Sequence, residues 1–248
     1  FRIQRHNMQH VHGGLLLPMR KDKIFVVNYN KHATTAIHHM FRINDYRGHH
    51  GVNWWINRGG SQAKKIIEKH DICSDGHPTS HAGELDWLLE QYPDCKFILP
   101  VRCLRAWVIS RFRHGQRMYD GWKSGRIKNP SAWEWAYPAD AEKVKQWLEQ
   151  INQHVENVFM SMRMCPERLW VVEINNTNNW EQYIREEFKL TTIDSKRRNI
   201  TPRDERLHSK LNSLVDNIDG LCVDTLSGEY QDMLVSQCKQ YKFNTNLI

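Results

Sequence analysis

Residues 23–28 have the sequence KIFVVN, and this stretch decides the fold. A short run of β-branched and aromatic residues between polar flanks is typical of a strand that is buried on both faces of a parallel sheet. The polar segment 28–32 follows, and residues 34–42 then have helical character. The stretch therefore predicts a strand–loop–helix unit, which is the repeating element of α/β folds.

The same pattern recurs further along the chain. Strands are predicted over residues 96–101 (KFILPV) and 169–174 (LWVVEI), and helices over residues 82–91, 104–113, 141–162 and 180–188. The helix over 141–162 has the clearest apolar face, because Val144, Trp147, Leu148, Ile151 and Val155 recur at helical spacing. Strands that alternate with helices predict an α/β fold with a central, mostly parallel sheet.

The sequence contains no internal repeat and no linker rich in Pro, Gly or Ser that would divide it. We therefore expect residues 1–248 to form a single domain, with residues 1–20 as a loose N-terminal lead-in. No apolar run approaches the roughly 20 residues that a membrane span needs, so we expect no membrane span and a cytoplasmic location.

Composition narrows the function classes. The 248 residues include 35 Lys or Arg and 28 Asp or Glu, a formal net charge of +7, which suggests a polyanionic partner: a phosphate-bearing cofactor, an acidic glycan or nucleic acid. No nucleic-acid-binding motif is present, which makes nucleic acid the weakest of the three. The six cysteines include no C-x-x-C pair, so we expect mostly reduced thiols and no metal site.

The loop that follows the first strand is the first candidate site. Ligands of α/β sheets bind where strands end and helices begin. Lys31, Thr34 and Thr35 stand at that turn, where side-chain donors, backbone amides and the helix dipole can cradle a phosphate. The glycines of a Walker A loop are absent. Taken alone, the segment fits an ordinary N-capped helix better than a phosphate-binding loop.

A second candidate follows the strand over residues 96–101. Arg102 stands at the strand end and Ser110 follows two helical turns later. A guanidinium offers a planar fork for bidentate contact with phosphate, and a hydroxyl offers one more donor. By itself this spacing is common in unrelated proteins.

Together the two segments resemble the sulfotransferases that use 3'-phosphoadenosine-5'-phosphosulfate (PAPS). The first loop of that family typically reads Tyr-Pro-Lys-Ser-Gly-Thr-Thr, and residues 29–35 read YNKHATT here. Its second segment has an Arg at a strand end and a Ser eight residues later, like Arg102 and Ser110. The resemblance is good over residues 23–113 and loose elsewhere. It implies a three-layer sandwich of the P-loop NTPase-like type.

The resemblance also implies a reaction and a set of contacts. A sulfuryl group would pass in line from PAPS to an acceptor hydroxyl or amine, with adenosine 3',5'-bisphosphate as product. Lys31 would be catalytic, because it would stabilise charge on the leaving group. The 5'-phosphosulfate would be held by Lys31, His32, Ala33, Thr34 and Thr35, and the 3'-phosphate by Arg102 and Ser110.

Several positions depart from the family pattern. Asn30 replaces the usual Pro, His32 the usual Ser and Ala33 the usual Gly. A glycine reaches positive φ freely, whereas alanine does so at a cost of roughly 1 kcal/mol. Either the loop avoids that conformation or cofactor binding is weakened. Ala36 replaces an aromatic residue that stacks on adenine in some members.

A general base and a late basic loop are also implied. Many members carry a His before a Pro-containing turn, a little over twenty residues ahead of the strand-end Arg. His77 fits this pattern best, and His81, Glu84 and Asp75 are alternatives. The segment 195–203 resembles the family's late basic loop, so the resemblance adds Arg197 and Arg198 to the cofactor-binding residues.

The acceptor stays open between a glycan, a small alcohol or phenol, and a peptide. Aromatic residues at 54–55 and at 119–137, in stretches interpreted as loops, fit either an acceptor pocket or a local core. Two other functions remain: a degenerate sulfotransferase fold that binds without catalysis, and a kinase-like P-loop enzyme.

Overall fold

The computed structural model describes residues 22–29, 31–51, 61–75, 85–128, 140–174, 180–192 and 223–245. The strands are β1 (Ile24–Val26), β2 (Gly48–His50), β3 (Ile72–Ser74), β4 (Lys96–Val101), β5 (Leu169–Glu173) and β6 (Asn244–Thr245). The helices are α1 (Thr34–Arg42), α3 (Ser61–Lys69), α4 (Asp86–Gln91), α5 (Leu104–Lys123), α7 (Ala141–Met162), the short 3-10 helix η1 (Pro166–Arg168), α8 (Trp180–Glu187) and α10 (Val223–Tyr241).

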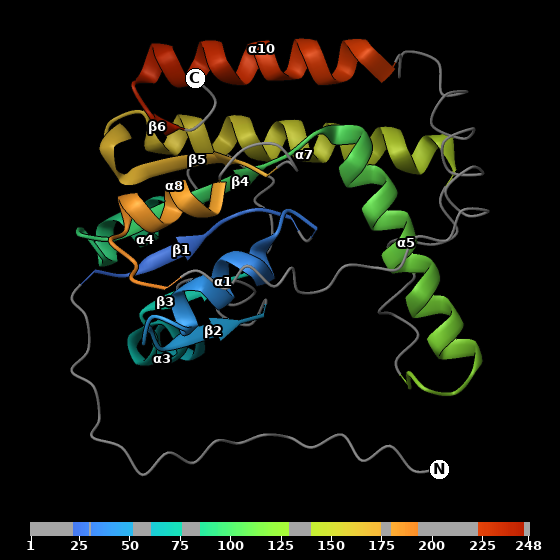
Figure 1. Cartoon of the computed structure of the whole chain (residues 1–248), viewed down its shortest axis with the longest axis horizontal. Helices are drawn as coiled ribbons and strands as arrows, with labels where there is room; N and C mark the ends of the chain where they lie inside the picture. Colours follow the sequence, from blue (N-terminus) through green and yellow to red (C-terminus); the bar gives the residue numbers. More distant parts are fainter. Residues whose placement is uncertain are drawn as a thin grey trace.

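The strands form one six-stranded sheet in the order β2-β3-β1-β4-β5-β6, and every pairing is parallel (Figure 1). The predicted α/β class with a mostly parallel sheet is therefore confirmed. The chain builds β2 and β3 on one side of β1 and then crosses to β4 on the other side. This reversal makes the carboxyl ends of β1 and β4 the place where a ligand-binding crevice is expected.

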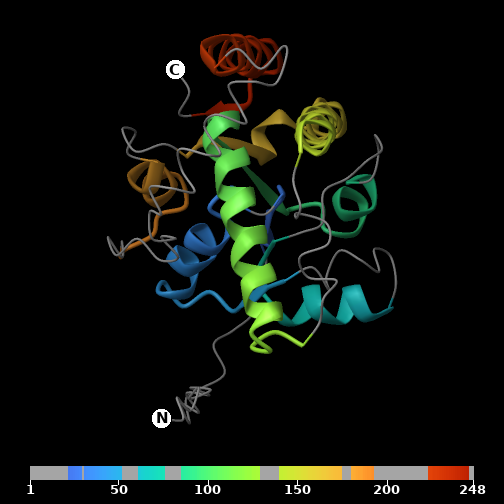
Figure 2. The ribbon, with the colours of Figure 1, turned by 90° about the vertical axis from the view of Figure 1, so that its right-hand side faces the viewer.

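The alternation of side chains along the central strands creates two cores. On β1, Phe25 faces one core while Ile24 and Val26 face the other, and all three are buried. Helices α1 and α8 cover the face of Ile24 and Val26, and α3, α4 and α7 cover the opposite face (Figure 2). The arrangement is consistent with a three-layer sandwich. Helix α10 lies beside the β6 edge of the sheet (Figure 2).

Helix α5 corrects one sequence-based prediction. It continues to Lys123, ten residues beyond the predicted end, so Tyr119 and Trp122 belong to a helix and not to a loop. The predicted end at residue 113 was wrong because a buried arginine interrupts the apolar face on which the prediction of the helix was based. The Arg111 guanidinium lies 4.9 Å from the Trp107 ring centroid and 4.5 Å from that of Trp147, which makes a cation suitable for the helix interface.

Polar groups at the amino edge of the sheet are tied down closely. The Arg47 guanidinium donates to both carboxylate oxygens of buried Asp71, from Nε at 3.0 Å and from Nη2 at 2.8 Å. The Lys23 ammonium donates to the carbonyl oxygens of Glu68 and His70, near the end of α3. Asn44 joins the end of α1 to the segment after α8, since its Nδ2 donates to the Thr192 carbonyl at 2.9 Å.

The described cysteines are all free thiols: Cys73, Cys95, Cys103, Cys165 and Cys238. Among the described helices, none combines the length and the apolar character that crossing a bilayer requires. The predicted lead-in over residues 1–20 lies outside the described residues.

Candidate functional site

The end of β1 is joined to the end of β4 by the buried side chain of Asn28. Its Nδ2 donates to the carbonyl oxygen of Pro100, and its Oδ1 accepts from the backbone N–H of Tyr29 at 2.7 Å. This side chain satisfies backbone groups of both strands where regular pairing stops. It fixes the point from which residues 29–33 lead into α1.

The loop after β1 uses left-handed backbone conformations. Lys31 has φ 73°, and Ala33, the N-cap of α1, has φ 57° and ψ 19°. Of the two alternatives left by the sequence, avoidance of a positive φ at Ala33 is therefore wrong. The loop keeps the conformation that the family's glycine favours and accepts a cost of about 1–2 kcal/mol. The carbonyl of Ala33 accepts from the N–H groups of Ala36 and Ile37, which begins the helix.

Arg102 brings the two sequence motifs together. Its Nη1 donates to the main-chain carbonyl of Lys31 at 2.9 Å, across the carboxyl edge of the sheet. Burial lowers the pKa of Arg102. Its buried Nε has no hydrogen-bond partner among the residues that the structure describes. The guanidinium thus supports the Lys31 loop.

Helix α5 adds further positive charge at the same place, because it runs across the carboxyl edge of the sheet (Figure 2). Burial is the main reason that the pKa of Lys31 falls to about 8; Arg117 and Arg102 also lower it, and Asp75 opposes the shift. Burial and the charges of Lys31, Arg117 and Arg111 lower the pKa of His114 to about 4. The Arg117 guanidinium lies 3.1 Å from His114 Nδ1. Positive charge is crowded around Lys31, and a bound anion would relieve it.

The two threonines of the loop contact groups at the ends of β2 and β3. Thr34 Oγ1 donates to Asp75 Oδ1 at 3.3 Å, and Asp75 itself has a φ of 61°. Thr35 Oγ1 lies 3.1 Å from Nε2 of His50. A carboxylate therefore stands next to the loop, within the electrostatic reach of Lys31.

His32 occupies the core. Its ring is 1% exposed, lies 5.2 Å from the Trp107 ring centroid, and has Nδ1 3.1 Å from the Tyr29 carbonyl oxygen. Burial and the charge of Arg102 lower the pKa of His32 well below its usual range. Because the imidazole is neutral and enclosed, it does not contact a ligand. His32 can offer a ligand only its backbone N–H.

The remaining predicted residues divide into two groups. Ser110 is half-buried on the second turn of α5, and no hydrogen bond joins it to Arg102 among the described residues. His77, Arg197 and Arg198 lie outside the described residues, as do His81 and Glu84. Of the residues proposed from sequence, Lys31, Ala33, Thr34, Thr35 and Arg102 meet at one edge of the sheet.

Sequence reasoning missed His114, Arg117 and His50. The signal for the first two was the spacing 110, 114, 117, which places these positions on one helix face. It went unused because the helix was predicted to end at residue 113.

A cavity of about 420 Å³ lies elsewhere, at the amino edge. Its lining residues are Asp22, Ile24, Tyr46, Lys96, Glu187, Phe188 and Lys189. It includes none of the residues above. The crowded positive charge at the carboxyl edge marks the better candidate site.

The sequence matches no model of a known protein family and no curated protein. The functional argument therefore depends on the residues and their geometry.

Proposed function

We propose that this chain is a sulfotransferase that transfers the sulfuryl group from PAPS to an acceptor hydroxyl or amine. The hydrogen bond from Arg102 to the Lys31 carbonyl is the observation that carries the proposal. Two motifs that are 71 residues apart in sequence become one site through this bond. Neither motif is specific alone, whereas their convergence at the carboxyl ends of β1 and β4 is what a shared ligand requires.

The electrostatics support a ligand with several negative charges. Lys31, Arg102 and Arg117 lower the pKa values of their neighbours because like charges repel in a partly desolvated place. A nucleotide with phosphates at both its 5' and 3' positions would compensate this charge at two points. Lys31 and the loop N–H groups would hold the 5' end, and the guanidinium of Arg102 would hold the 3'-phosphate.

The chain's own residues would act by position and charge. PAPS supplies an activated sulfuryl group on a phosphosulfate anhydride. Lys31 would stabilise negative charge on the oxygen of the breaking bond, and the N–H groups of Thr34 and Thr35 at the start of α1 would donate to the ligand. Such catalysis depends on fixed donors, which the loop's left-handed residues preorganise.

Asp75 is the described candidate for the general base. It lies at the end of β3, bonded to Thr34 and close enough to Lys31 to affect its pKa. A carboxylate there can accept the proton of an acceptor hydroxyl. His77, two residues further along, stays a prediction. Replacement of either residue by Asn or Gln would identify the base, since the true base supports turnover and not cofactor binding.

Calorimetric titration tests the proposal. We expect adenosine 3',5'-bisphosphate to bind at least tenfold more tightly than AMP or ATP, and Lys31→Ala and Arg102→Ala to remove that preference. Lys64→Ala, an exposed lysine on α3, is the control and should bind normally. Equal affinity for all three nucleotides would overturn the proposal. Tight bisphosphate binding without turnover on any acceptor would favour the degenerate, binding-only fold.

One contact favours a kinase-like alternative. A hydroxyl and a carboxylate at the ends of β1 and β3, like Thr34 and Asp75, form the pair that holds Mg²⁺ in P-loop NTPases. The glycines of a Walker A loop are absent from the sequence, which places this alternative second. Mg²⁺-dependent ATP hydrolysis that Asp75→Asn abolishes would favour it.

A further inference from the structure

The positive excess of the chain is concentrated in one segment. Residues 102–128 contain eight Lys or Arg and one acidic residue, Asp120. The rest of the chain contains 27 basic and 27 acidic residues, so its formal charge is zero. Nearly all of this segment is helix α5 and the turn that follows it. The segment has a formal net charge of +7, of which +4 lies on α5 itself, a helix about 30 Å long, and this is a linear field suited to a linear anion.

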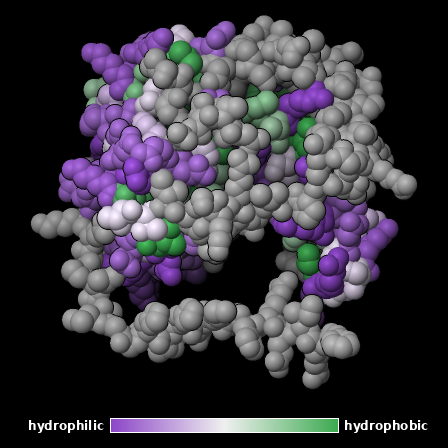
Figure 3. Space-filling view, viewed as in Figure 1, coloured by the Kyte–Doolittle hydropathy of each residue, from purple (hydrophilic) through white to green (hydrophobic). Residues whose placement is uncertain are grey.

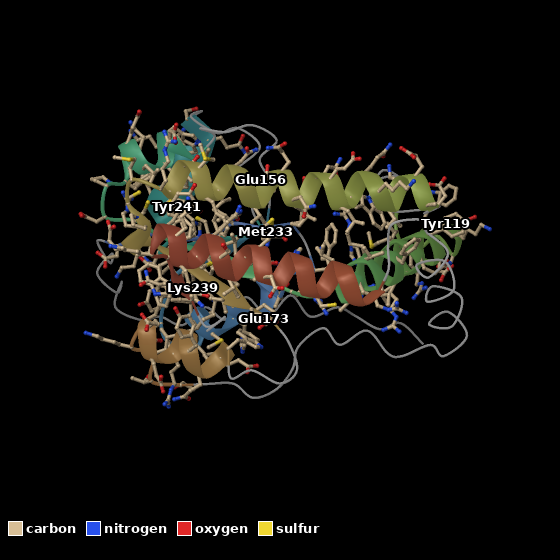
Figure 4. The ribbon with its side chains drawn as sticks, turned by 90° about the horizontal axis from the view of Figure 1, so that it is seen from above. Tyr119, Glu156, Glu173, Met233, Lys239 and Tyr241 are labelled. Atoms are coloured by element: carbon tan, nitrogen blue, oxygen red, sulfur yellow. The ribbon has the colours of Figure 1, made fainter. Side chains whose placement is uncertain are left out.

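The far part of this segment, residues 118–128, extends past the Lys31 loop; we call it the α5 arm. Tyr119 lies at one end of the molecule, distant from Lys239 and Tyr241 (Figure 4). The far end of α5 forms mostly hydrophilic surface (Figure 3). The exposed residues of the arm are Asp120, Trp122, Lys123, Ser124, Gly125, Arg126 and Lys128.

Aromatic rings stand among these cations. The ring centroids of Tyr119 and Trp122 are 6.0 Å apart, and the Lys123 ammonium lies 4.6 Å from the Tyr119 centroid. Trp122 is 38% exposed. The turn is folded back on the helix, because the Ile127 N–H donates to the Gly121 carbonyl and a Cβ at Gly121 would lie 2.6 Å from Ile127 Cδ1. Within this turn Arg126 Nε donates to Ser124 Oγ at 2.9 Å.

We propose that the α5 arm binds an acidic polysaccharide, which is the acceptor substrate of the site at Lys31. This inference rests on the proposed function for the identity of the acceptor, but not for the binding of the polymer. A sulfuryl acceptor must present a hydroxyl, and a polysaccharide presents several in each repeat. Aromatic faces beside cations suit sugar rings that carry carboxylates or sulfates.

The other anionic polymers fit less well. Peptides are commonly held along a free strand edge or in an apolar groove, and the arm is a charged helix surface. Single-stranded DNA would use stacked aromatic rings, yet it has no internal hydroxyl to accept a sulfuryl group. Both are outcomes of the test.

Charge reversal tests the α5 arm. Lys123→Glu, Arg126→Glu and Lys128→Glu are combined in one variant, and Lys64→Glu, Lys65→Glu and Lys69→Glu on α3 form the control with the same change of charge. The probes are a hyaluronan decasaccharide, poly-L-glutamate and a ten-nucleotide oligo-dT, each at 150 mM salt without nucleotide. We expect the arm variant to bind hyaluronan at least tenfold more weakly than the wild type, and the α3 variant to stay within twofold.

Equal effects of the two variants, or equal or tighter binding of the peptide or the DNA, would overturn the inference. Bisphosphate titration of the same variants separates the two proposals. If the bisphosphate binds normally and reversal of the arm's charges leaves hyaluronan binding unchanged, only the inference about the α5 arm is overturned. If hyaluronan binding depends on the arm but the protein does not bind the bisphosphate, only the proposed function is overturned.

A second inference comes from a chain of hydrogen bonds beside the loop. Thr35 Oγ1 lies 3.1 Å from His50 Nε2, His50 Nδ1 lies 2.8 Å from Ser74 Oγ, and Ser74 Oγ lies 2.9 Å from His38 Nδ1. Burial and the neighbouring His50 lower the pKa of His38 to about 3, so His38 is neutral at working pH. The chain joins α1, β2 and β3 and ends at a predicted ligand residue.

The protons of this chain can all point in one direction along it in two ways. A neutral imidazole has one donor and one acceptor nitrogen, and a hydroxyl has one proton. In the first arrangement His38 donates to Ser74, Ser74 to His50, and His50 to Thr35. In the second, Thr35 donates to His50, His50 to Ser74, and Ser74 to His38. Only the first leaves the Thr35 hydroxyl proton available to a ligand.

We infer that Ser74 and His50 are positioning residues that turn Thr35 into a donor when an anion binds. The anion selects the first arrangement, because it accepts the Thr35 proton and polarises the whole chain toward itself. This inference also rests on the proposed function, since the anion is the 5' group of the nucleotide. It predicts that Ser74 acts only through Thr35.

A double-mutant cycle tests this dependence. We expect Ser74→Ala to weaken bisphosphate binding about fivefold and Thr35→Val about tenfold, and the double variant to be no weaker than Thr35→Val. The same cycle with Thr34→Val is the control, in which the two effects should multiply. Multiplied effects in the Thr35 cycle, or no effect of Ser74→Ala, would overturn the inference. If the wild type does not bind the bisphosphate, the result would instead count against the proposed function.

Discussion

The two edges of the sheet treat charge in opposite ways. At the amino edge, cations are matched to acceptors: Arg47 is held by both oxygens of Asp71, and Lys23 by two carbonyl groups. At the carboxyl edge, burial and the charges of Arg117 and Arg102 lower the pKa of Lys31. Removing a cation is therefore expected to cost stability at the first edge and to add it at the second. Such a difference is expected when one edge must complete its charge balance with a ligand.

Backbone strain does not follow this division. Lys31, Ala33 and Asp75 have positive φ where β1 and β3 end, and Asp45, Lys189 and Lys242 have positive φ elsewhere in the described residues. Left-handed conformations in residues other than glycine persist where the surroundings impose them, and they concentrate at functional sites. Substitutions at each edge test the difference in how the two edges hold charge.

The largest effect is expected at the amino edge. Arg47→Ala leaves the Asp71 carboxylate, which is 2% exposed, without its guanidinium. We expect a loss of about 3 kcal/mol in the free energy of unfolding, measured by urea titration. Lys64→Ala breaks an exposed pair with Glu68 at 4.0 Å and should change the free energy of unfolding by less than about 1 kcal/mol. Similar small losses in both variants would refute the stabilising role given to this edge.

At the carboxyl edge the sign reverses. Lys31→Met should raise the free energy of unfolding at pH 7 by about 1 kcal/mol, because it removes a partly buried ammonium from beside other cations. The folded pKa of about 8 lies below the ordinary value of 10.5, so the unfolded chain binds more protons between these values. The stability of the wild type should therefore rise across that window and approach that of the variant. A variant less stable than the wild type at pH 7 would contradict this account.

The smallest effect concerns the strained alanine. Ala33→Gly removes the left-handed penalty but adds freedom to the unfolded chain, and we expect a net gain of about 0.5–1 kcal/mol. Ala36→Gly, inside α1, should instead cost about 1 kcal/mol. Thermal unfolding of the pair provides the measurement. Equal losses in both would mean that φ at Ala33 carries no strain.

Much of the fold could be predicted from the sequence, and the reason is local. Strands β1, β4 and β5 are buried on both faces, so each appears as a continuous apolar run. Strands β2, β3 and β6 were missed. β2 (Gly-His-His) and β6 (Asn-Thr) contain no apolar run, and β3 (Ile-Cys-Ser) is too short an apolar run to stand out.

The site could be predicted only in part. Lys31 and Arg102 follow buried strands, and the order of strands then brings them together. The proximity of His114 and Arg117 to Lys31 could not be predicted, because it depends on the angle at which α5 crosses the sheet. The burial of His32 beneath the loop likewise depends on Trp107, which is 75 residues away in sequence and meets it only after folding.

The central claim is that Lys31 is held partly uncharged until an anion arrives. Calorimetry of adenosine 3',5'-bisphosphate binding at pH 8, in two buffers of different ionisation enthalpy, measures the protons taken up. The account predicts an uptake of about half a proton by the wild type, since binding raises the Lys31 pKa from about 8. Lys31→Arg, which is always charged, should bind with no uptake. Binding by the wild type without proton uptake, or no binding at all, would contradict the account.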